Sequence, residues 1–423
     1  MTVCVVGTGA REHALAVALA RHDRVVVTPG NPGMTARIDG EPISVSAAPP
    51  EEIDADLVVV GPESALVDGL ADKLRAMGRR VFGPGAKGAR LEGSKAFMKE
   101  ILAEAGVITA RHGVFDEPEA ARKFLGQLPG PFVVKTDGLA GGKGVLVTQS
   151  RADALADVEA KLSGAAFGEA GRRVVIEEGL FGVECSVHVL CDGRTAVPLP
   201  CARDYKRVHD ADEGPNTGGM GAVAPCAYPA DAELVSQVLE RAVQPVLGAL
   251  RRRGIEYRGV LYAGIMVTVD GPAVLELNVR FGDPETQVIL PLIDDDLKKV
   301  LCDTADGCLQ EAPRAASASA VCVVAAAPGY PGHPTLGQPI GGLRPDGQLA
   351  QPVEGAYVLH AGTAVTPEGG FSVAGGRVLS LVGLGSEPSV ARDRAYRALG
   401  RVGWEGLQAR GDIAAGQDGG PVR

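Results

Sequence analysis

The chain contains 423 residues, of which 45% are hydrophobic and 22% are charged, so its composition excludes a disordered or collagen-like protein. At roughly 150 residues per domain, this length predicts two to four folded domains. The formal net charge of −10 disfavours nucleic acid and anionic membranes as partners, because their phosphate groups would repel the protein.

Apolar strands and helices alternate along the N-terminal quarter of the chain. Strands are predicted at 3–6, 25–27, 57–60 and 80–82, and helices at 11–20, 66–77 and 94–102. Strands that alternate with helices are typical of parallel sheets, because a parallel connection needs a crossover. We therefore expect a doubly wound βαβ domain at residues 1–103.

The remaining chain predicts mixed α+β structure. Short strands are predicted at 132–135, 145–148 and 173–177 with a helix at 152–162, longer strands at 184–191, 260–269 and 273–279 with a helix at 231–253, and a last group of strands at 321–326, 353–361 and 377–383 with a helix at 389–402. The longer strands suggest an antiparallel sheet. The last group indicates a small α+β domain at 317–413, and residues 414–423 are expected to be disordered.

The cysteines indicate the cellular compartment. The eight cysteines form no C-x-x-C pair, which argues against a zinc site and against a disulfide framework. No apolar run has the length of a membrane span or the position of a signal peptide. We therefore expect free thiols, a cytoplasmic location and no membrane partner.

A glycine turn follows the first predicted strand. Gly9 and Arg11 stand where a dinucleotide-binding fingerprint would begin, but Glu12 occupies the position of its third glycine. The segment 29–33 (PGNPG) also lacks the acidic residue that would hold the ribose of NAD. A glycine turn before a helix, with an arginine beside it, suits the phosphate of a sugar monophosphate. The alternative is a plain strand-to-helix turn.

A second glycine-rich loop, at 138–145, lies between two predicted strands. Backbone amides of such a loop can wrap phosphate oxygens, and Lys135 and Lys143 supply positive charge. The loop is not a Walker A motif, because Gly144 stands where Ser or Thr would bind Mg²⁺. We interpret it as a hairpin flap that closes over a nucleotide, and the alternative is a flexible hairpin tip.

Glu276 and Asn278 are two residues apart in a predicted strand and therefore share one face. Their oxygen atoms suit Mg²⁺ bound beside nucleotide phosphates. Arg280 shares this face if the strand continues, and a turn with two acids follows at 281–286. The alternative is a plain exposed strand face.

Residues 204–221 form a long, polar, glycine-rich segment in an otherwise apolar region. Segments of this kind are usually functional or disordered. Their mixed charges suggest a substrate that carries a cation and an anion, and the alternative is a solvated surface loop. With no nucleophilic serine motif present, the residues predict phosphoryl transfer from ATP but do not identify the acceptor.

With these segments in place, the sequence resembles the phosphoribosylamine–glycine ligases (glycinamide ribonucleotide synthetases), a family of the ATP-grasp superfamily. The resemblance spans nearly the whole chain, and GPNTGGMGA at 214–222 and ELNVRFGDPETQ at 276–287 are its most specific segments. The other matching segments are GTGAREHAL at 7–15, PGNPG at 29–33, VGPE at 60–63, FGP at 82–84, LEGSKAF at 91–97, VKTDGLAGGKGV at 134–145, VIEE at 175–178, DYKR at 204–207, HAGT at 360–363 and GGRVL at 375–379.

The resemblance implies an ATP-grasp core at 104–122 and 191–316, in which two sheets sandwich ATP, and a mobile ATP lid at 123–190. It also implies the ligation of glycine to 5-phosphoribosylamine in purine biosynthesis. ATP would be cleaved to ADP and phosphate, with Mg²⁺ or Mn²⁺ as the metal. Small molecules would be the partners, without nucleic acid, and we expect a monomer.

The resemblance further implies roles for individual residues. Arg280, Lys206 and Asp212 would be catalytic, and Glu276 and Asn278 would bind the metal. ATP would contact Lys95, Lys135, Gly141, Gly142, Lys143, Gly144, Glu177, Glu178 and Glu184. The substrates would contact Gly9, Arg11, Glu12, Asn31, Pro215, Asn216, Thr217, Gly218, Asp283 and Glu285.

Six residues depart from the family pattern: Ala10, Thr136, Gly179, Val183, Arg203 and Tyr205. Three other classes of protein remain open. An NAD-dependent oxidoreductase lacks its ribose-binding acid here, and an ATP-grasp ligase or carboxylase for another acid would carry a different 204–221 segment. A nucleotide sensor would have lost Lys143 or Glu276.

Overall fold

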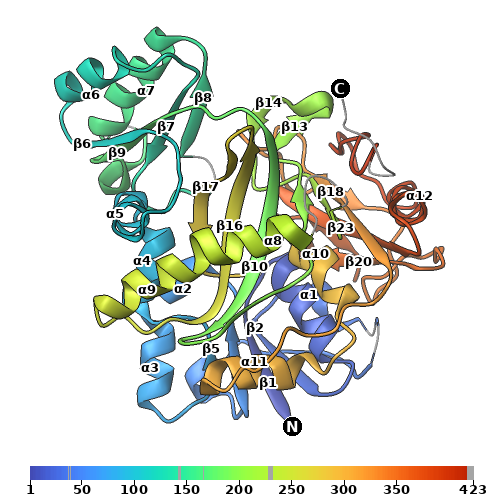
Figure 1. Cartoon of the computed structure of the whole chain (residues 1–423). Coiled ribbons are helices and arrows are strands. Elements are labelled where there is room, and N and C mark those ends of the chain that lie inside the picture. Colours follow the sequence, from blue (N-terminus) through green and yellow to red (C-terminus); the bar gives the residue numbers. More distant parts are fainter. Residues whose placement is uncertain (37, 39, 142–143, 165, 227–231, 417–423) are drawn as a thin grey trace.

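A computed structural model of the chain describes all residues except 37, 39, 142–143, 165, 227–231 and 417–423. Figure 1 shows an N-terminal sheet at the bottom, a long central sheet above it, a small layer that projects at the upper left, and a C-terminal sheet at the right. Helices and strands mix throughout, which confirms the predicted α/β and α+β multidomain class.

The N-terminal sheet is parallel and five-stranded, with the order β3-β2-β1-β4-β5. Its strands are β1 (Thr2–Gly7), β2 (Arg24–Pro29), β3 (Ser44–Val45), β4 (Leu57–Val60) and β5 (Val81–Phe82), and the helices of this part are α1 (Ala10–Leu19), α2 (Glu63–Val67), α3 (Leu70–Ala76) and α4 (Ala86–Gly93). The helix predicted at 66–77 is thus two helices, α2 and α3. Gly69 separates them because its φ of 85° lies in the left-handed region, which ends a right-handed helix.

The projecting layer is a four-stranded antiparallel sheet with the order β6-β9-β7-β8. It contains β6 (His112–Phe115), β7 (Phe132–Thr136), β8 (Val145–Thr148) and β9 (Val174–Glu178), with α6 (Pro118–Leu125) and α7 (Arg151–Leu162) packed on it. The layer has its own hydrophobic cluster, which packs its two helices against its sheet. Gly179 lies against Pro131, whose Cγ would be 2.4 Å from a Cβ at this position, and this contact explains the glycine.

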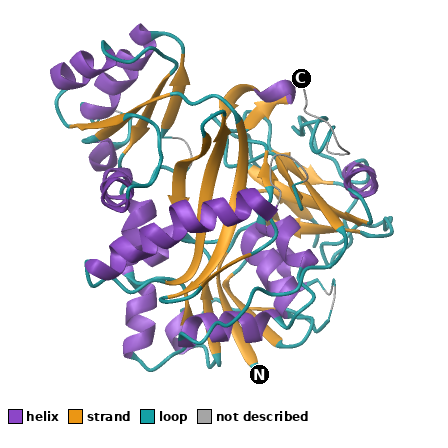
Figure 2. Ribbon diagram, in the orientation of Figure 1, coloured by secondary structure: helices purple, strands orange, loops and turns teal. Residues whose placement is uncertain are grey.

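The central sheet has the order β11-β10-β16-β17, and all its pairs are antiparallel, as predicted. It comprises β10 (Val183–Asp192), β11 (Ala196–Pro198), β16 (Arg258–Thr268) and β17 (Gly271–Asn278). In Figure 2, one long helical stretch crosses in front of it, formed by α8 (Ala232–Val238), a π-helical turn (Leu239–Val243) and α9 (Gln244–Arg252). This stretch and α5 (Lys95–Ala105), whose N-cap is Ser94, bury apolar side chains against the sheet.

The C-terminal sheet has the order β12-β15-β18-β23-β20. Its strands are β12 (Arg203–Asp204), β15 (Gly221–Ala224), β18 (Ser319–Ala326), β20 (Ala356–His360) and β23 (Arg377–Gly385). Along the chain, β12 is connected to its neighbour β15 by a separate hairpin of β13 (Arg207–His209) and β14 (Glu213–Asn216). The small strands β19 (Pro339–Ile340), β21 (Thr363–Val365) and β22 (Phe371–Val373) form a separate sheet, and the helices are α10 (Thr286–Ile289), α11 (Leu297–Asp306) and α12 (Pro388–Leu399). The polar 204–221 segment is therefore largely hydrogen-bonded structure.

The domain boundaries drawn from the sequence remain predictions. At the expected start of the disordered tail, Ala414 is buried and its N–H donates a hydrogen bond to the hydroxyl of Tyr205 (3.0 Å). The tail from residue 417 lies outside the described residues. Within the described chain, no helix has the length and apolar character needed to cross a membrane.

Candidate active site

The end of β17 brings Glu276, one of the two predicted metal ligands, beside a lysine. Lys206 Nζ lies 3.0 Å from Glu184 Oε2 and 3.6 Å from Glu276 Oε1. Burial opposes ionisation of Glu276, but the charges of Lys206, Lys135 and Arg280 lower its pKa to about 2. Glu276 is therefore a carboxylate at neutral pH.

The donor set at this strand end fits a hard divalent cation. Glu276 supplies an ionised oxygen and Asn278, two residues further along β17, supplies an amide oxygen. Among the described residues, no group of three His, Cys, Asp or Glu side chains is arranged to hold a metal by itself. A cation here would need oxygen atoms from elsewhere, as Mg²⁺ commonly takes from nucleotide phosphates.

Arg280 is held by two carboxylates that the sequence did not single out. Its Nη2 lies 2.9 Å from Glu92 Oε1, and its Nε lies 3.2 Å from Glu63 Oε2. Burial opposes ionisation of Glu63, but Arg280 and Arg11 lower its pKa to about 2. Glu63 lies in the VGPE motif and Glu92 lies in the LEGSKAF motif, so the motifs could have drawn attention to both acids. Nothing in the sequence, however, indicates that they pair with Arg280.

One of the predicted nucleotide lysines, Lys135, pairs with the buried acid Glu177. Lys135 Nζ lies 2.9 Å from Glu177 Oε1 and donates a hydrogen bond to the carbonyl of Leu275 (3.0 Å). Lys99, which the sequence analysis missed, lies 3.2 Å from Glu177 Oε2. Burial lowers the pKa of Lys99 to about 8, with Glu177 opposing this shift. In this structure Glu177 therefore pairs with two lysines, and its contact with adenosine stays a prediction.

Lys95, Gly141 and Gly144 lie in or beside the glycine-rich loop, whereas Glu178 pairs with Phe132 at the other end of β7. Antiparallel pairing of β7 with β8 confirms that the loop closes a hairpin. Lys95 Nζ donates to the carbonyl of Gly138 (3.4 Å), and burial and Lys135 lower the pKa of Lys95. Gly141 is exposed and Gly144 is buried, while Gly142 and Lys143 lie outside the described residues. Glu178 accepts a hydrogen bond from the Arg111 N–H (2.9 Å).

In the glycine turn after β1, the Gly9 N–H is already hydrogen-bonded to the side chain of Glu12. Glu12 accepts hydrogen bonds from the Gly9 N–H (2.7 Å) and from Arg11 Nε (2.6 Å). Arg11 is buried, and its Nη1 also donates to the carbonyl of Phe281 (3.3 Å) and lies 3.8 Å from Glu63. A phosphate at this turn would have to replace Glu12 at the Gly9 N–H, so the expected sugar-phosphate contact stays a prediction.

Asn31 ties the N-terminal sheet to the C-terminal sheet. Its Nδ2 donates to the carbonyls of Thr8 (2.8 Å) and His360 (3.0 Å), and its Oδ1 accepts from the Gly33 N–H (3.0 Å). His13 accepts a hydrogen bond from the His360 N–H at Nδ1 (2.9 Å). The side chain of Asn31 thus connects the two sheets by hydrogen bonds, and its predicted contact with substrate is untested.

The predicted site residues of the 204–218 segment lie in two different places, one near Glu276 and the other near Arg410. Lys206 lies in the charged cluster, and its carbonyl accepts hydrogen bonds from the Thr217 N–H and hydroxyl (both 2.8 Å). Asp212 is exposed and pairs with Arg410 Nη1 (2.7 Å), while Pro215 and Asn216 belong to β14. The structure therefore gives Asp212 a C-terminal partner, and its predicted catalytic role has no contact here to support it.

Two further carboxyl groups, those of Glu285 and Asp204, interact electrostatically with Lys206. Glu285 is buried and accepts a hydrogen bond from Ser186 Oγ (3.0 Å), and burial raises the pKa of Glu285. Burial also raises the pKa of Asp204 to about 8, with Glu285 adding to the shift and Lys206 opposing it. Asp204 was not singled out, although the DYKR motif contains it.

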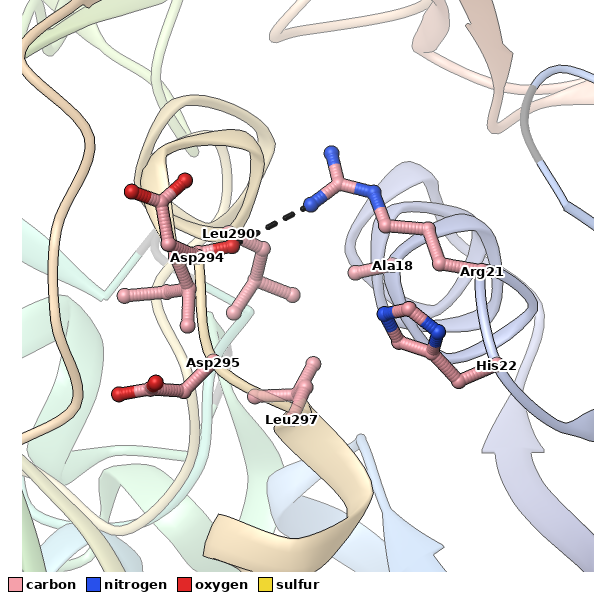
Figure 3. A pocket seen from close by; sticks show the side chains of 8 residues that line it. Ala18, Arg21, His22, Leu290, Asp294, Asp295 and Leu297 are labelled. Atoms are coloured by element: carbon pink, nitrogen blue, oxygen red, sulfur yellow. Dashed lines mark hydrogen bonds between the residues drawn. The ribbon is translucent and has the colours of Figure 1, made fainter.

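The molecule also contains a hollow outside the candidate active site. A cavity of about 270 Å³ lies between α1 and the segment before α11. Figure 3 shows its polar side chains, with Arg21 donating a hydrogen bond to the carbonyl of Ile293 (3.3 Å) across one side. Its lining residues are Ala18, Arg21, His22, Leu290, Ile293, Asp294, Asp295 and Leu297, and none of them is a predicted site residue.

Comparisons with known families define the class of protein first. The family model described as "Phosphoribosylglycinamide synthetase, ATP-grasp (A) domain" matches residues 93–286, and the N domain and C domain models of the same name match 1–92 and 320–416. The protein is therefore an ATP-grasp protein. It belongs to the phosphoribosylglycinamide synthetase family.

Individual relatives agree with this assignment. The phosphoribosylamine–glycine ligase of Streptomyces coelicolor is 46% identical over 98% of this chain and 99% of that protein. The crystal structure of the Thermotoga maritima phosphoribosylamine–glycine ligase is 35% identical, covers 98% of this chain and 100% of that chain, and has a TM-score of 0.80. The biotin carboxylase domain of Hydrogenobacter thermophilus 2-oxoglutarate carboxylase, solved with MgADP, is 18% identical and covers 96% of this chain and 91% of that chain, with a TM-score of 0.69, and supports the fold alone.

Proposed function

We propose that this protein is a carbon–nitrogen ligase that joins glycine to 5-phosphoribosylamine, with cleavage of ATP to ADP and phosphate. The product is glycinamide ribonucleotide, in purine biosynthesis, and the intermediate is glycyl phosphate. Family membership over nearly the full chain supports the reaction. The observation that connects this reaction with the candidate site is the ionised Glu276, which lies beside Lys206 at the end of β17.

The chemistry requires activation of a carboxylate. Glycine is a poor acyl donor because hydroxide is a poor leaving group, whereas phosphorylation provides phosphate as the leaving group. The amine of phosphoribosylamine then attacks the acyl carbon, forms the amide bond and loses a proton as phosphate leaves. We assign to Arg280, which is held between Glu63 and Glu92, the role of stabilising the negative charge that develops on the acyl phosphate.

In the proposed ATP site, lysines bind the phosphates and oxygen ligands bind the metal. We assign Lys95, Lys135 and Lys143 to the nucleotide phosphates, and Glu276 with Asn278 to Mg²⁺ or Mn²⁺. A bound cation would neutralise phosphate charge and so make the terminal phosphorus easier to attack. Lys206 balances Glu184 and Glu276 until substrates arrive. We further propose a cytoplasmic monomer whose partners are small molecules.

The test is ADP release in a coupled assay with purified protein, ATP and Mg²⁺. Glycine and phosphoribosylamine together should give rapid ADP release, and omission of either substrate should reduce it strongly. Bicarbonate in place of glycine is the matched control for a carboxylase, and it should not support turnover. ADP release that ignores glycine would contradict the proposed reaction.

A further inference from the structure

Arg377, the first residue of β23, reaches from the C-terminal sheet to two loops of the candidate site. Its Nη2 lies 2.8 Å from Asp283 Oδ2, and its Nη1 donates hydrogen bonds to the carbonyls of Asp283 (2.8 Å) and Gly218 (2.7 Å). Burial opposes ionisation, but Asp283 raises the pKa of Arg377, so the group stays charged. One guanidinium group therefore fixes two segments that are far apart in the sequence.

Each of these two segments leads to a different part of the site. Asp283 Oδ2 lies 3.8 Å from the position of a Cβ on Gly9, so it adjoins the glycine turn after β1. On the other side, Thr217 precedes Gly218 and donates its hydroxyl hydrogen bond to the Lys206 carbonyl (2.8 Å). Arg377 thus stands between the turn at Gly9 and the backbone of Lys206.

The two loops meet so closely that glycine is required. A Cβ on Gly219 would lie 2.4 Å from Pro284 Cδ, and its φ of +110° lies in the left-handed region that favours glycine. A Cβ on Gly218 would lie 3.1 Å from Arg377 Cζ. The geometry of this junction is fixed by backbone packing and by the guanidinium together.

Lys95 and Lys135, the two nucleotide lysines that the structure describes, take no part in this junction. Lys135 donates to a carbonyl of β17, and Lys95 donates to the carbonyl of Gly138, the first residue of the glycine-rich loop. The contacts of Arg377 are instead with the segments that the family resemblance assigns to the other substrates. A disturbance at Arg377 should therefore act on those substrates and spare ATP.

We propose that Arg377 is a positioning residue for phosphoribosylamine. By joining Asp283 to Gly218, it fixes the positions of the two loops that lie between the Gly9 turn and Lys206. A residue of the C-terminal sheet thereby determines the affinity for the sugar-phosphate amine. This inference rests on the proposed ligase reaction. Lysine cannot replace Arg377, because a single ammonium group lacks the planar fork that serves a carboxylate and two carbonyls at once.

The experiment measures KM for phosphoribosylamine, glycine and ATP in five proteins: wild type, Arg377→Lys, Asp283→Asn, the double variant and a control. Arg344→Lys is the matched control, because Arg344 also pairs with an aspartate in the C-terminal region, Asp346 (2.8 Å), but both side chains are about half exposed. Absence of ADP release by the wild type with both substrates would refute the ligase reaction itself and is thus distinguishable from failure of this inference.

With an active wild type, Arg377→Lys should raise KM for phosphoribosylamine about tenfold, the loss expected for one charge-assisted contact, and should leave KM for ATP within about twofold. Asp283→Asn should give a similar rise, and the double variant should be no worse than the larger single effect, because both changes break the same pair. Arg344→Lys should match wild type. An unchanged KM for phosphoribosylamine, an equal rise in KM for ATP, additive effects, or loss of folding in both single variants would each overturn the proposal.

Discussion

Glu63 offers a direct test of the charge network around Arg280. We consider the substitution Glu63→Gln, which keeps the size of the side chain but removes its charge. Glu63 Oε2 lies 3.2 Å from Arg280 Nε and 3.8 Å from Arg11 Nη1, and its side chain is 26% exposed. Both guanidinium groups would lose a shared counter-ion, so stability and turnover should both fall.

The magnitude follows from the pKa of Glu63. That pKa is lowered from 4.5 to about 2 in the folded protein, and at 1.36 kcal/mol per pH unit the difference corresponds to about 3 kcal/mol at most. Because the folded-state pKa is the lower one, this contribution is fully present above pH 4.5 and is lost as the pH falls towards about 2. The glutamine can still accept a hydrogen bond, so we expect a loss of about 2 to 3 kcal/mol at pH 7.

Urea unfolding of both proteins at pH 7, 5, 4 and 3 measures this difference. The gap between wild type and Glu63→Gln should be largest at pH 7 and 5 and should shrink at pH 4 and 3. Glu51→Gln is the control, because the partner of Glu51 is the largely exposed Lys73, and exposed pairs contribute less than about 1 kcal/mol. A gap that is equally small for both variants, or that does not change between pH 5 and pH 3, would refute the reasoning.

Three further predictions test the assigned roles. Glu276→Gln should lower kcat by orders of magnitude and weaken the dependence on Mg²⁺ while circular dichroism shows a retained fold, and unchanged turnover would exclude Glu276 as a metal ligand. Hydrogen exchange at residues 138–144 should slow when ATP and Mg²⁺ bind, whereas equal exchange with and without nucleotide would indicate a static hairpin. Arg11→Ala should raise KM for phosphoribosylamine by at least tenfold and leave KM for ATP nearly unchanged. A selective loss of ATP affinity, or tight binding of NAD by the wild type, would show that the N-terminal turn has another ligand.

The sequence predicted the parts of the site that depend on local pattern. Alternation along 273–279 placed Glu276 and Asn278 on one face of a strand, and the structure has that strand as β17. Glycines between two apolar strands predicted the β7–β8 hairpin in the same way. Periodicity reports which residues are neighbours within one element, and these features require nothing more.

Contacts between distant segments were beyond such reasoning. Glu92 lies in α4, a helix that was not predicted because its two glycines are weak helix formers, yet it pairs with Arg280. Lys99 looks in sequence like an ordinary surface lysine of α5, but tertiary packing buries it against Glu177. Arg377 begins a strand in another sheet. These partners are set by how sheets meet, which no local window of residues records.

The pairing of β15 with β18 has a consequence for any attempt to divide the protein. Residues 221–224 hydrogen-bond along residues 320–323, so a cut near residue 317 would separate two neighbouring strands of one sheet. The larger fragment would carry a buried apolar strand with a bare edge, which is a template for association with other chains. We therefore expect fragments 1–316 and 317–423 to be insoluble when produced separately and to recover solubility when co-expressed, as two halves of one sheet.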